Sequence, residues 1–380
     1  MQMLRIANII EDARLGGPQI RMAKVAGRLD RSRFETTVIL PEDDSAGFTG
    51  RLESEGVQYK KFPLHRLTKE PPHLFKFVLF FFYEVFLLWR FFRRERFDIV
   101  HVSGGAWQWK GVLAGRLAGT KILWELNDTQ MPIYIKMIFK LASFLVHSYI
   151  VVSNRTRRYY VDSLKLKNKE IFEIQSPVDC AFFDPAITPQ DGRLEEVGGI
   201  KVTTVCNVNP IKGLEDFVML AAELNKSHQG LNFFIVGRVF SSTRKYFEKL
   251  TSLMRALHVR NLFFYEGSDA VERILQSTDI YVCSSKAEAS PLAVWEAMAM
   301  AKPIVSTDVG DVSSFVRNGE AGVIVSAGKL LPEGVKTLLA DMDIARQYGR
   351  KAREIALHEL DISVCVKKHE EVYQKVGVRS

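Results

Sequence analysis

The sequence predicts an α/β protein made of two Rossmann-like domains, each with a parallel sheet, facing each other across a cleft. Three observations support this fold class. The chain has 380 residues, which suggests two domains on a prior of ~150 residues each. Short apolar runs alternate with helical stretches in both halves, as in parallel sheets covered by helices on both faces. Between the halves, residues 177–199 contain three prolines and three glycines and are expected to form the linker.

The first half contains apolar runs that are expected to form strands at residues 4–10, 36–40, 97–102, 122–126 and 148–152. A helix is expected to begin at Pro18, because proline is favoured at the first helical position. A second helix, residues 110–118, follows the strand at 97–102. We place this N-terminal domain at residues 1–185.

The second half repeats the alternation, with strands expected at residues 202–205, 232–236, 262–265 and 279–285. Helices are expected to begin near Leu214 and Thr243, and another is expected from Leu292 to Met300. Strands alternating with helices indicate a second parallel sheet. We place this C-terminal domain at residues 186–362 and a final helix within residues 363–380.

The most informative segment, residues 281–309, contains two glutamates on either side of a helix start. Ser290 suits the N-cap and Pro291 the first helical position. From Leu292 the helix is apolar on nearly every face except at Glu296, and such a helix is normally buried. A carboxylate there must pair with a cation, become neutral or face a ligand-filled crevice.

Glu288 precedes this helix, on the loop at the carboxyl end of a strand, where open α/β sheets bind their ligands. The helix N-terminus offers free backbone N–H groups and a positive dipole end to a phosphate. Two carboxylates for sugar hydroxyls beside an anion site suit a nucleotide sugar. The alternative is that Glu296 forms an internal salt bridge.

Two loops of the first domain are further candidates for ligand binding. Gly16 and Gly17 precede Pro18 and form a side-chain-free approach to a helix N-terminus, which suits a phosphate but equally suits an ordinary turn. Trp107 follows the strand at 97–102, where its face is suited to stacking on a sugar. Packing of Trp107 against the helix at 110–118 is the alternative.

The net charge of +8 and a pI near 9.2 favour anionic partners. Nucleic acid is not expected among them, because no basic tract is interleaved with stacking aromatics in a recognisable binding motif. The four cysteines form no metal-like C-x2-C pair, so a reducing cytosol is the default. The N-terminus lacks a signal-peptide layout, and we therefore expect a cytoplasmic protein.

Residues 74–97 are almost continuously aromatic and aliphatic and end in four arginines. Their uninterrupted apolar stretches are too short to cross ~30 Å of hydrocarbon. A helix lying in the membrane interface fits better, with aromatics at the lipid boundary and arginines on headgroups. The alternative is a helix buried against the sheet. The arginines favour peripheral contact with the inner face of a membrane.

Glu288 and Glu296 resemble the Glu-x7-Glu signature of retaining glycosyltransferases of family 4, which have the GT-B fold. The continuation EAMAMAKPIVSTDVGDVSSFVRNGEAGVIV, the segment NVNPIKG at 207–213 and the segment FFIVGRV at 233–239 resemble the same family. The resemblance is strong in the C-terminal half and weak in the N-terminal half. It implies a GT-B fold whose final helix returns to the first domain.

The resemblance also implies roles for individual residues. Lys212 would contact the donor diphosphate, Glu296 the ribose hydroxyls and Glu288 the transferred sugar, with Lys212 and Glu288 as the catalytic residues. The remaining donor-binding candidates are Gly16, Gly17, Asn207, Gly237, Arg238, Ser290, Pro291 and Leu292. In similar proteins the donor base is recognised through backbone groups near residues 266–270.

Two departures from the family pattern bear on activity. Asn207 stands where the family commonly has an arginine that pairs with the lysine on the phosphates. Either Arg238, Arg21 or Arg14 compensates, or Lys212 and helix dipoles alone hold the diphosphate. The stretch 122–132 lacks the histidine that many members place near the reacting sugar. The acceptor-side candidates there are Glu125, Asn127 and Asp128, together with Trp107.

We therefore expect a retaining hexosyltransferase that moves a hexose from a UDP- or GDP-sugar to a hydroxyl of a glycan or lipid-linked acceptor, in cell-surface polysaccharide or glycolipid synthesis. The resemblance implies no cofactor and no catalytic metal. Three alternatives remain: a GT-B nucleotide-sugar epimerase, a catalytically inactive GT-B partner subunit, and a membrane-surface scaffold. Asn207 and the missing histidine favour the inactive subunit, whereas Lys212, Glu288 and Glu296 oppose it.

Overall fold

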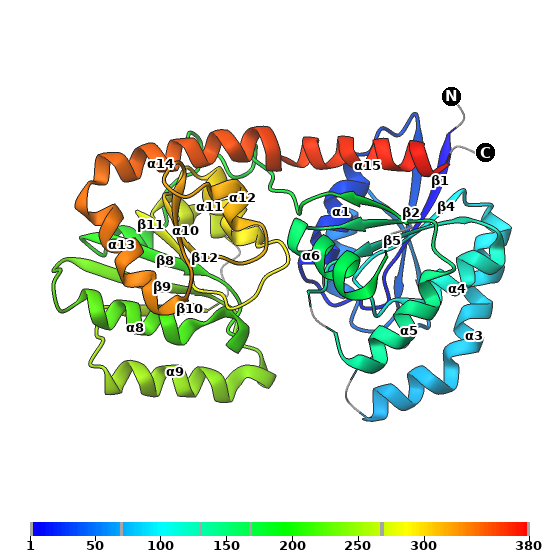
Figure 1. Ribbon diagram of the computed structural model, residues 1–380, viewed down its shortest axis with the longest axis horizontal. Coiled ribbons are helices and arrows are strands. Elements are labelled where there is room, and N and C mark those ends of the chain that lie inside the picture. The colour runs from blue at the N-terminus through cyan, green and yellow to red at the C-terminus, as the bar shows by residue number, and fades with distance from the viewer. Residues whose placement is uncertain (1–2, 69–70, 130, 167–168, 267–269, 378–380) are drawn as a thin grey trace. The chain divides into compact units, whose positions relative to one another are not determined.

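The computed structural model describes residues 3–68, 71–129, 131–166, 169–266 and 270–377. The chain divides into two compact units, which Figure 1 shows. Unit 1 comprises Met1–Ser176 and Ile362–Ser380, and unit 2 comprises Pro177–Asp361. The division falls after Ser176, not after residue 185 as placed from the sequence. The turn-rich segment belongs to unit 2 because Val178 pairs with Asp361 in a β-bridge and the Cys180 backbone N–H donates to Asp361.

Unit 1 is built on a seven-stranded sheet in the order β3-β2-β1-β4-β5-β6-β7, and all its pairs are parallel. The strands are β1 (Leu4–Ile9), β2 (Phe34–Pro41), β3 (Gln58–Phe62), β4 (Ile99–Val102), β5 (Lys121–Leu126), β6 (Ser148–Val151) and β7 (Glu170–Glu173). The two edge strands, β3 and β7, were not expected from the sequence. Both are rich in charged and polar residues, because an edge strand is only partly buried.

Helices cover both faces of this sheet. One face carries α1 (Gly17–Arg28), α2 (Ala46–Ser54) and the C-terminal α15 (Ile362–Gly377), which packs on α1 and on β1. The other carries α3 (Pro71–Glu95), α4 (Trp109–Ala118), α5 (Ile133–Ser143), α6 (Asn154–Arg158) and the π-helical turn η1 (Tyr159–Ser163). This division follows from right-handed crossovers, because the chain runs from β1 outward to β3 and then returns to β4 beside β1.

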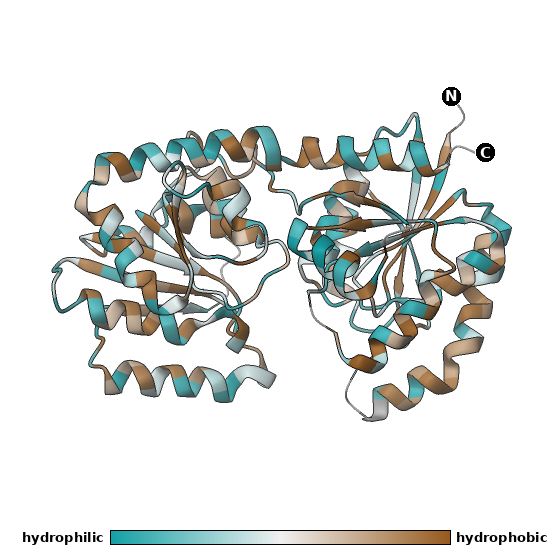
Figure 2. Cartoon of the chain, viewed as in Figure 1, coloured by the Kyte–Doolittle hydropathy of each residue, from teal (hydrophilic) through white to brown (hydrophobic). Residues whose placement is uncertain are grey.

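Helix α3 is buried against the domain on one side, as the second alternative for residues 74–97 expected, and contact with a membrane stays a prediction. Its inner side packs against α4 and buries Phe77, Leu88 and Phe92 in the core of unit 1. Its outer side leaves large apolar side chains in solvent, among them Phe82, which is 78% exposed. The hydropathy colouring in Figure 2 shows how much of α3 and of the neighbouring α5 is apolar. Among the described residues, no helix is both long enough and apolar enough to span a bilayer.

Unit 2 is built on a six-stranded sheet in the order β10-β9-β8-β11-β12-β13, also parallel throughout. The strands are β8 (Ile200–Val205), β9 (Leu231–Gly237), β10 (Leu262–Glu266), β11 (Ile280–Cys283), β12 (Ile304–Thr307) and β13 (Gly322–Val325). The α-helices are α7 (Gly192–Glu195), α8 (Leu214–Leu224), α9 (Arg244–Ala256), α10 (Val271–Gln276), α11 (Leu292–Ala299), α12 (Val312–Val316), α13 (Leu331–Ala340) and α14 (Met342–Ile355). Shorter turns are η2 (Pro210–Lys212), η3 (Ser241–Thr243), η4 (Gly328–Leu330) and η5 (Ala356–Leu360).

In both sheets the chain reverses direction at a central strand. The reversal lies between β1 and β4 in unit 1 and between β8 and β11 in unit 2. Loops that leave adjacent strands at such a switch point diverge to opposite faces, and this opens a crevice outside the carboxyl ends of the strands. The two switch points are therefore where ligand-binding residues are expected.

Candidate functional site

Lys212 and Glu288 contact each other at the switch point of unit 2. Lys212 ends the turn η2 after β8, and Glu288 lies on the loop after β11. The Lys212 ammonium Nζ lies 2.5 Å from Glu288 Oε1, and the Ser285 hydroxyl donates to the same oxygen at 2.7 Å. Both charged side chains are mostly buried, with 25% and 15% of their surfaces exposed. The sequence-predicted pair of catalytic residues is thus one ion pair.

The pair keeps Lys212 charged. Burial by itself would lower the pKa of the Lys212 ammonium, but the attraction of Glu288 outweighs burial and raises that pKa above its usual 10.5. A cation held in this way beside open backbone groups is a fixed positive charge for a phosphate. A ligand phosphate that binds Lys212 must therefore compete with the Glu288 carboxylate.

Glycine makes the close approach of these two loops possible. Gly213 has a φ of +61°, and a Cβ on it would lie 2.1 Å from the Ser284 carbonyl oxygen. The Ser284 hydroxyl donates to the Lys212 carbonyl at 2.9 Å, and the Lys286 N–H donates to the Ile211 carbonyl at 2.8 Å. Only glycine fits a left-handed position so close to another backbone. Lys212 is therefore positioned by backbone geometry as well as by its charge.

Three predicted donor-binding residues lie at the ends of β8 and β9. Asn207 and Arg238 are exposed, and the Val208 N–H donates to the Arg238 carbonyl at 2.9 Å, which holds the two loops together. A Cβ on Gly237 would lie 1.8 Å from the Cys206 carbonyl oxygen, so this position also requires glycine. These residues lie on the strands next to the Lys212 loop. Residues 267–269, within the segment expected to recognise the base, lie outside the described residues.

The start of helix α11 differs from the expectation by one residue. Pro291 is the N-cap and Leu292 the first helical residue, whereas Ser290 was expected to cap the helix. No side chain caps the helix, and the Ser290 hydroxyl accepts a hydrogen bond from the Trp295 indole at 3.1 Å. Glu296 is half-buried, on the same helical side as Leu292, while its neighbour Trp295 is fully buried. The carboxylate of Glu296 therefore lies on the one side of α11 that is not sealed in the core.

In unit 1, the carboxyl end of β1 leads to the glycines expected near the phosphates. Helix α1 begins at Gly17, one residue before the expected Pro18, and Gly16 is its N-cap in an extended conformation with no side-chain cap. A Cβ on Gly16 would lie 3.2 Å from the Gln19 side-chain oxygen. Because Gly16 has no side chain, this residue does not block the approach of a ligand to the backbone N–H groups at the start of α1.

Three acceptor-side candidates lie together at the ends of β4 and β5. Gly105 has a φ of +93°, and a Cβ on it would lie within 2.6 Å of oxygens of Asn127 and Asp128. The Ala106 N–H donates to Asp128 at 2.6 Å, and the half-buried Trp107 makes a side-chain hydrogen bond to the same carboxyl. Burial raises the pKa of Asp128, and these hydrogen bonds oppose the rise only in part.

Glu125 does not belong to this group, although the sequence placed it there. It is the fifth residue of β5, is 4% exposed and points to the sheet face covered by α1 and α15. Its Oε2 lies 3.6 Å from Arg21, 3.6 Å from His101 and 3.9 Å from His369. Burial would raise the pKa of Glu125, but Arg21 and the histidines hold it well below its usual value. The same contacts bury Arg21, so it does not replace the missing arginine on the phosphates.

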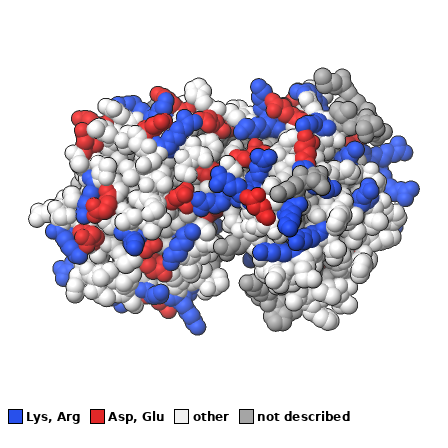
Figure 3. Space-filling model, in the orientation of Figure 1, with Lys and Arg blue, Asp and Glu red and all other residues white. Residues whose placement is uncertain are grey.

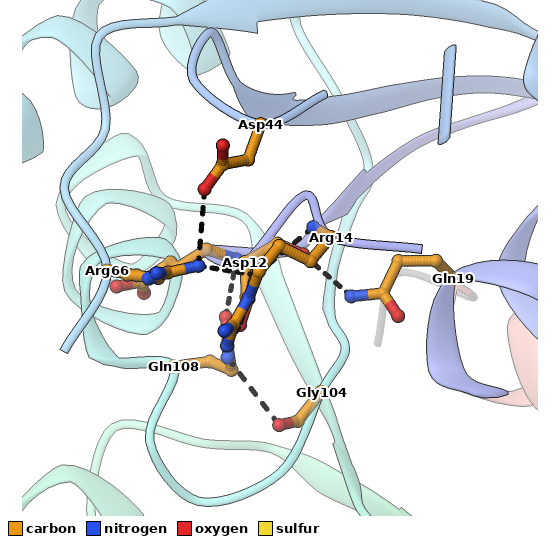
Figure 4. Close-up of polar contacts among 8 residues, drawn as sticks. Asp12, Arg14, Gln19, Asp44, Arg66, Gly104 and Gln108 are labelled. Atoms are coloured by element: carbon orange, nitrogen blue, oxygen red, sulfur yellow. Dashed lines mark hydrogen bonds and ion pairs between the residues drawn. The ribbon is translucent and has the colours of Figure 1, made fainter. Parts of the chain in front are cut away.

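Unit 1 also contains a polar pocket that was not expected from the sequence. It has a volume of about 40 Å³ and lies at the carboxyl ends of β1, β2 and β3. Figure 4 shows Arg66 between two carboxylates, 3.7 Å from Asp12 and 3.5 Å from Asp44. Asp12 also pairs with Arg14 at 2.6 Å, so Arg14 is engaged in unit 1 as well. The signal available in the sequence was a run of acidic residues after each of two strands, Glu11–Asp12 after β1 and residues 42–44 after β2.

Among the described residues, no three histidine, cysteine or acidic side chains are arranged to hold a metal ion.

Comparison with known protein families assigns both units. Residues 15–182 match the model described as glycosyltransferase family 4, and residues 191–355 match the one described as glycosyl transferases group 1. The chain belongs to the group 1 glycosyltransferases of family 4. The two matches together cover both parallel sheets except β1, which precedes residue 15, and they confirm the family expected from Glu288 and Glu296.

Curated relatives match over shorter stretches. The alpha-maltose-1-phosphate synthase of Mycolicibacterium smegmatis is 32% identical over 115 residues, which are 28% of this chain and 30% of that protein. The lipopolysaccharide core biosynthesis mannosyltransferase LpcC of Rhizobium leguminosarum is 29% identical over 185 residues, 47% of this chain and 52% of that protein. The chain thus spans about a third to a half of the length of these relatives.

Solved structures match over the whole chain and confirm the GT-B fold. A glycosyltransferase from Rickettsia africae has a TM-score of 0.85 at 18% identity and covers 100% of both chains. The Anabaena protein HepE, solved in complex with UDP, has a TM-score of 0.81 at 15% identity, covering 98% of this chain and 100% of that one. A further structure of HepE contains UDP-glucose.

Proposed function

We propose that this protein is a retaining hexosyltransferase that uses a UDP- or GDP-sugar as donor and a hydroxyl of a glycan or lipid-linked molecule as acceptor. The observation that carries the proposal is the Lys212–Glu288 ion pair at the switch point of unit 2. It is supported by HepE, a structural neighbour solved with UDP and with UDP-glucose. Relatives that bear the names of sugar-transferring and sugar-phosphate-forming enzymes agree with it.

In the proposed mechanism, Lys212 binds the donor diphosphate and offsets the negative charge that grows on it as the glycosidic bond breaks. A preorganised charge of this kind contributes most where charge develops in the transition state. Glu296 binds the ribose hydroxyls, and Glu288 turns from Lys212 toward the hydroxyls of the sugar. The acceptor hydroxyl attacks from the face that the leaving diphosphate vacates, and its proton passes to a phosphate oxygen. Neither a metal ion nor a cofactor is required by these steps.

On the acceptor side, Asp128 is the residue that we propose to orient the incoming hydroxyl, with Asn127 and Trp107 beside it. Its carboxyl is held in place by the Ala106 N–H and by the Trp107 side chain, so it is positioned to hydrogen-bond an incoming hydroxyl. The proposed reaction needs no further base, because the donor phosphate receives the acceptor proton. The acceptors we propose are intermediates of cell-surface polysaccharide or glycolipid synthesis, handled in the cytoplasm at the inner membrane face.

The test is a panel of UDP- and GDP-sugars measured by thermal shift and by slow donor hydrolysis. A ligand that binds only the native state raises the melting temperature by mass action. We expect one donor to stabilise the protein and to be hydrolysed, and both effects to be lost in Lys212→Ala and Glu296→Ala. If no donor shifts a well-folded sample, the proposed activity is wrong.

The inactive partner subunit remains the second candidate because of one observation. The exposed Asn207 stands where a second cation on the diphosphate is expected, and the exposed Arg238 follows the neighbouring strand β9. Donor binding without hydrolysis or transfer to any acceptor would favour this candidate. Restored or increased turnover in Asn207→Arg would then identify the missing charge as the cause.

A further inference from the structure

The inner side of helix α3 is fixed to unit 1 by buried charges. Glu84 is fully buried, and its Oε2 lies 2.6 Å from the Lys110 ammonium of α4. The His65 ring lies 2.5 Å from the other oxygen of Glu84, and Lys110 also approaches Glu11 at 3.8 Å. Removing one member of a buried network of this kind is costly, because its partners lose their compensation. Helix α3 is therefore a rigid part of the domain and not a detachable segment.

The outer side of α3 is apolar and exposed. Six large side chains within its first sixteen residues have about half or more of their surface in solvent: Phe75, Val78, Leu79, Phe82, Tyr83 and Phe86. They recur at the three- and four-residue spacing of one helical side. Apolar residues scattered singly on a surface are ordinary, but a contiguous set of this size marks an interaction surface.

Helix α5 repeats this arrangement. Its outer side and the residue that follows it expose a second set: Ile133, Tyr134, Met137, Ile138, Leu141 and Phe144. The most exposed are Ile133 at 78% and Phe144 at 79%. Its inner side buries Ile135 and Phe139 in the core. The exposed apolar side of α5 was not expected from the sequence, because apolar residues lie on both sides of this helix.

The two exposed sets belong to one surface. Helices α3, α4 and α5 cover the same face of the sheet, with α4 packed against both neighbours. Figure 1 shows α3 and α5 running alongside α4, and Figure 3 shows a broad region without charged residues over the same part of unit 1. Along the chain, α3 follows β3 and α5 follows β5, after connections of eight and six residues. Asp128 lies in the connection between β5 and α5.

Most of the charges around this surface are cationic, with the exposed Asp162 of η1 as an exception. Helix α5 contributes Lys136 and Lys140 and has no acidic residue, and α6 is the sequence Asn-Arg-Thr-Arg-Arg. On α3, Lys76 and Arg90 are exposed, whereas Glu84 is buried. A second copy of the chain placed against this surface would bring cations against cations. A bilayer with anionic headgroups accepts both the apolar side chains and the cations.

We propose that the outer faces of α3 and α5 form a single docking surface for a bilayer that contains anionic lipids, with α5 as an equal partner of α3. The proposal extends the membrane contact of residues 74–97 and rests on the proposed function only in its choice of a membrane-linked acceptor. The apolar side chains enter the headgroup boundary, and Lys136, Lys140 and the α6 arginines lie against lipid phosphates.

The test is sedimentation of the full-length protein with vesicles of phosphatidylcholine alone or mixed with phosphatidylglycerol. We expect binding to the mixed vesicles, weakened by salt because the cations contribute to it. Ile133→Asp changes α5 at its first turn, where an acidic residue is compatible with the helix dipole. Full removal of one isoleucine from the apolar phase corresponds to about a tenfold loss of vesicle affinity or more.

The control is Ile187→Asp in unit 2, which replaces the same residue type at nearly the same exposure, 74% against 78%. It should bind vesicles like the parent protein. A second pair compares Lys136→Glu/Lys140→Glu with the parent protein on mixed vesicles, where we expect an even larger loss. All variants should keep the parent's melting temperature and its donor hydrolysis in the absence of vesicles.

Three results would overturn the proposal: no vesicle binding by the parent protein, equal binding by Ile133→Asp and Ile187→Asp, or loss of self-association in Ile133→Asp without any change in vesicle binding. The last result would identify a second copy of the chain as the occupant. Vesicle binding with no hydrolysis of any donor would leave the docking surface intact and contradict the proposed enzyme activity instead.

Discussion

Replacing Glu288 by glutamine should separate the two roles of the Lys212–Glu288 pair. In the free protein the Glu288 carboxylate holds the Lys212 ammonium at 2.5 Å, so a diphosphate must displace it. The variant keeps the shape of the side chain and its hydrogen bond to Ser285 but removes the competing charge. We therefore expect tighter binding of free UDP or GDP, together with slower sugar transfer or donor hydrolysis.

The magnitude follows from the contact that is lost. The Lys212 ammonium stays charged, so its hydrogen bond to the amide remains worth about 1.5 kcal/mol or more, whereas the bond to the carboxylate also includes the attraction of an opposite charge, about 1 kcal/mol or more at this separation. The diphosphate would thus regain about 1–2 kcal/mol in the variant, which corresponds to roughly a 5- to 30-fold lower Kd. The gain should be smaller for a nucleotide sugar, because the proposed contact of Glu288 with the sugar is lost at the same time.

Titration calorimetry with UDP, GDP and the preferred nucleotide sugar measures these differences. Glu223→Gln is the matched control, because it breaks a Lys–Glu pair of similar length, 2.6 Å to Lys226, on the surface of α8. Lys212→Met should weaken all three ligands. If Glu288→Gln weakens free UDP and GDP as Lys212→Met does, the carboxylate orients the ammonium for the diphosphate and does not compete with it, and the reasoning above is refuted.

Three further outcomes are expected, all concerning stability. Burial raises the pKa of Glu11 to about 7 from 4.5, so the native state retains a proton that the unfolded chain releases, and about 3 kcal/mol of stability is lost as the pH rises from 4.5 through 7. The free energy of unfolding, measured with urea at pH 5 and pH 8, should fall in the parent protein and not in Glu11→Gln. If it changes equally with pH in both proteins, Glu11 is excluded as the cause. Gly213→Ala should destabilise unit 2 by more than Gly230→Ala, because both positions have positive φ but only a Cβ at position 213 would meet a backbone oxygen. Melting curves of the two variants test this. Similar losses of stability, of about 1 kcal/mol each, would show that the loop at Gly213 adjusts to the added Cβ. The depressed pKa of Glu125 contributes stability above pH 4.5 that is lost as the pH falls through the folded value; Glu125→Gln should be less stable at pH 7 and less sensitive to acid, and an unchanged acid limb in its melting profile would contradict this.

The sequence predicted the fold because strands and helices depend on local patterns, whereas the donor-binding roles stay predictions. The strand, loop and helix of residues 281–309 follow from apolar runs, and the place of Glu288 follows from the rule that ligands bind beyond strand ends. Lys212 was indicated by the family resemblance of residues 207–213. The contact between them could not be predicted, because it depends on how loops from β8 and β11 meet across the switch point. Gly213 was the available signal, but a glycine in a turn has many explanations.

Other details depended on register and on long-range packing. Glu125 and Asp128 are three residues apart. Glu125 lies inside β5 and faces the side of the sheet that α1 and α15 cover, whereas Asp128 lies beyond the strand end. Period-two alternation fixes such a difference only when the strand boundary is known to one residue. Helix α5 was missed as a surface helix because Ile135 and Phe139 point inward while Ile133 and Leu141 point outward.

The ion pair between Glu84 and Lys110 has a mechanical consequence for a protein that works on a bilayer. Because this buried pair joins α3 to α4, we expect α3 not to move independently of the sheet. Unit 1 would therefore rest on the lipid at a fixed height, and the distance from the headgroup plane to the carboxyl edge of its sheet would be constant. On the proposed docking surface, this constant height would favour acceptors whose reactive hydroxyl projects from the membrane by a matching distance.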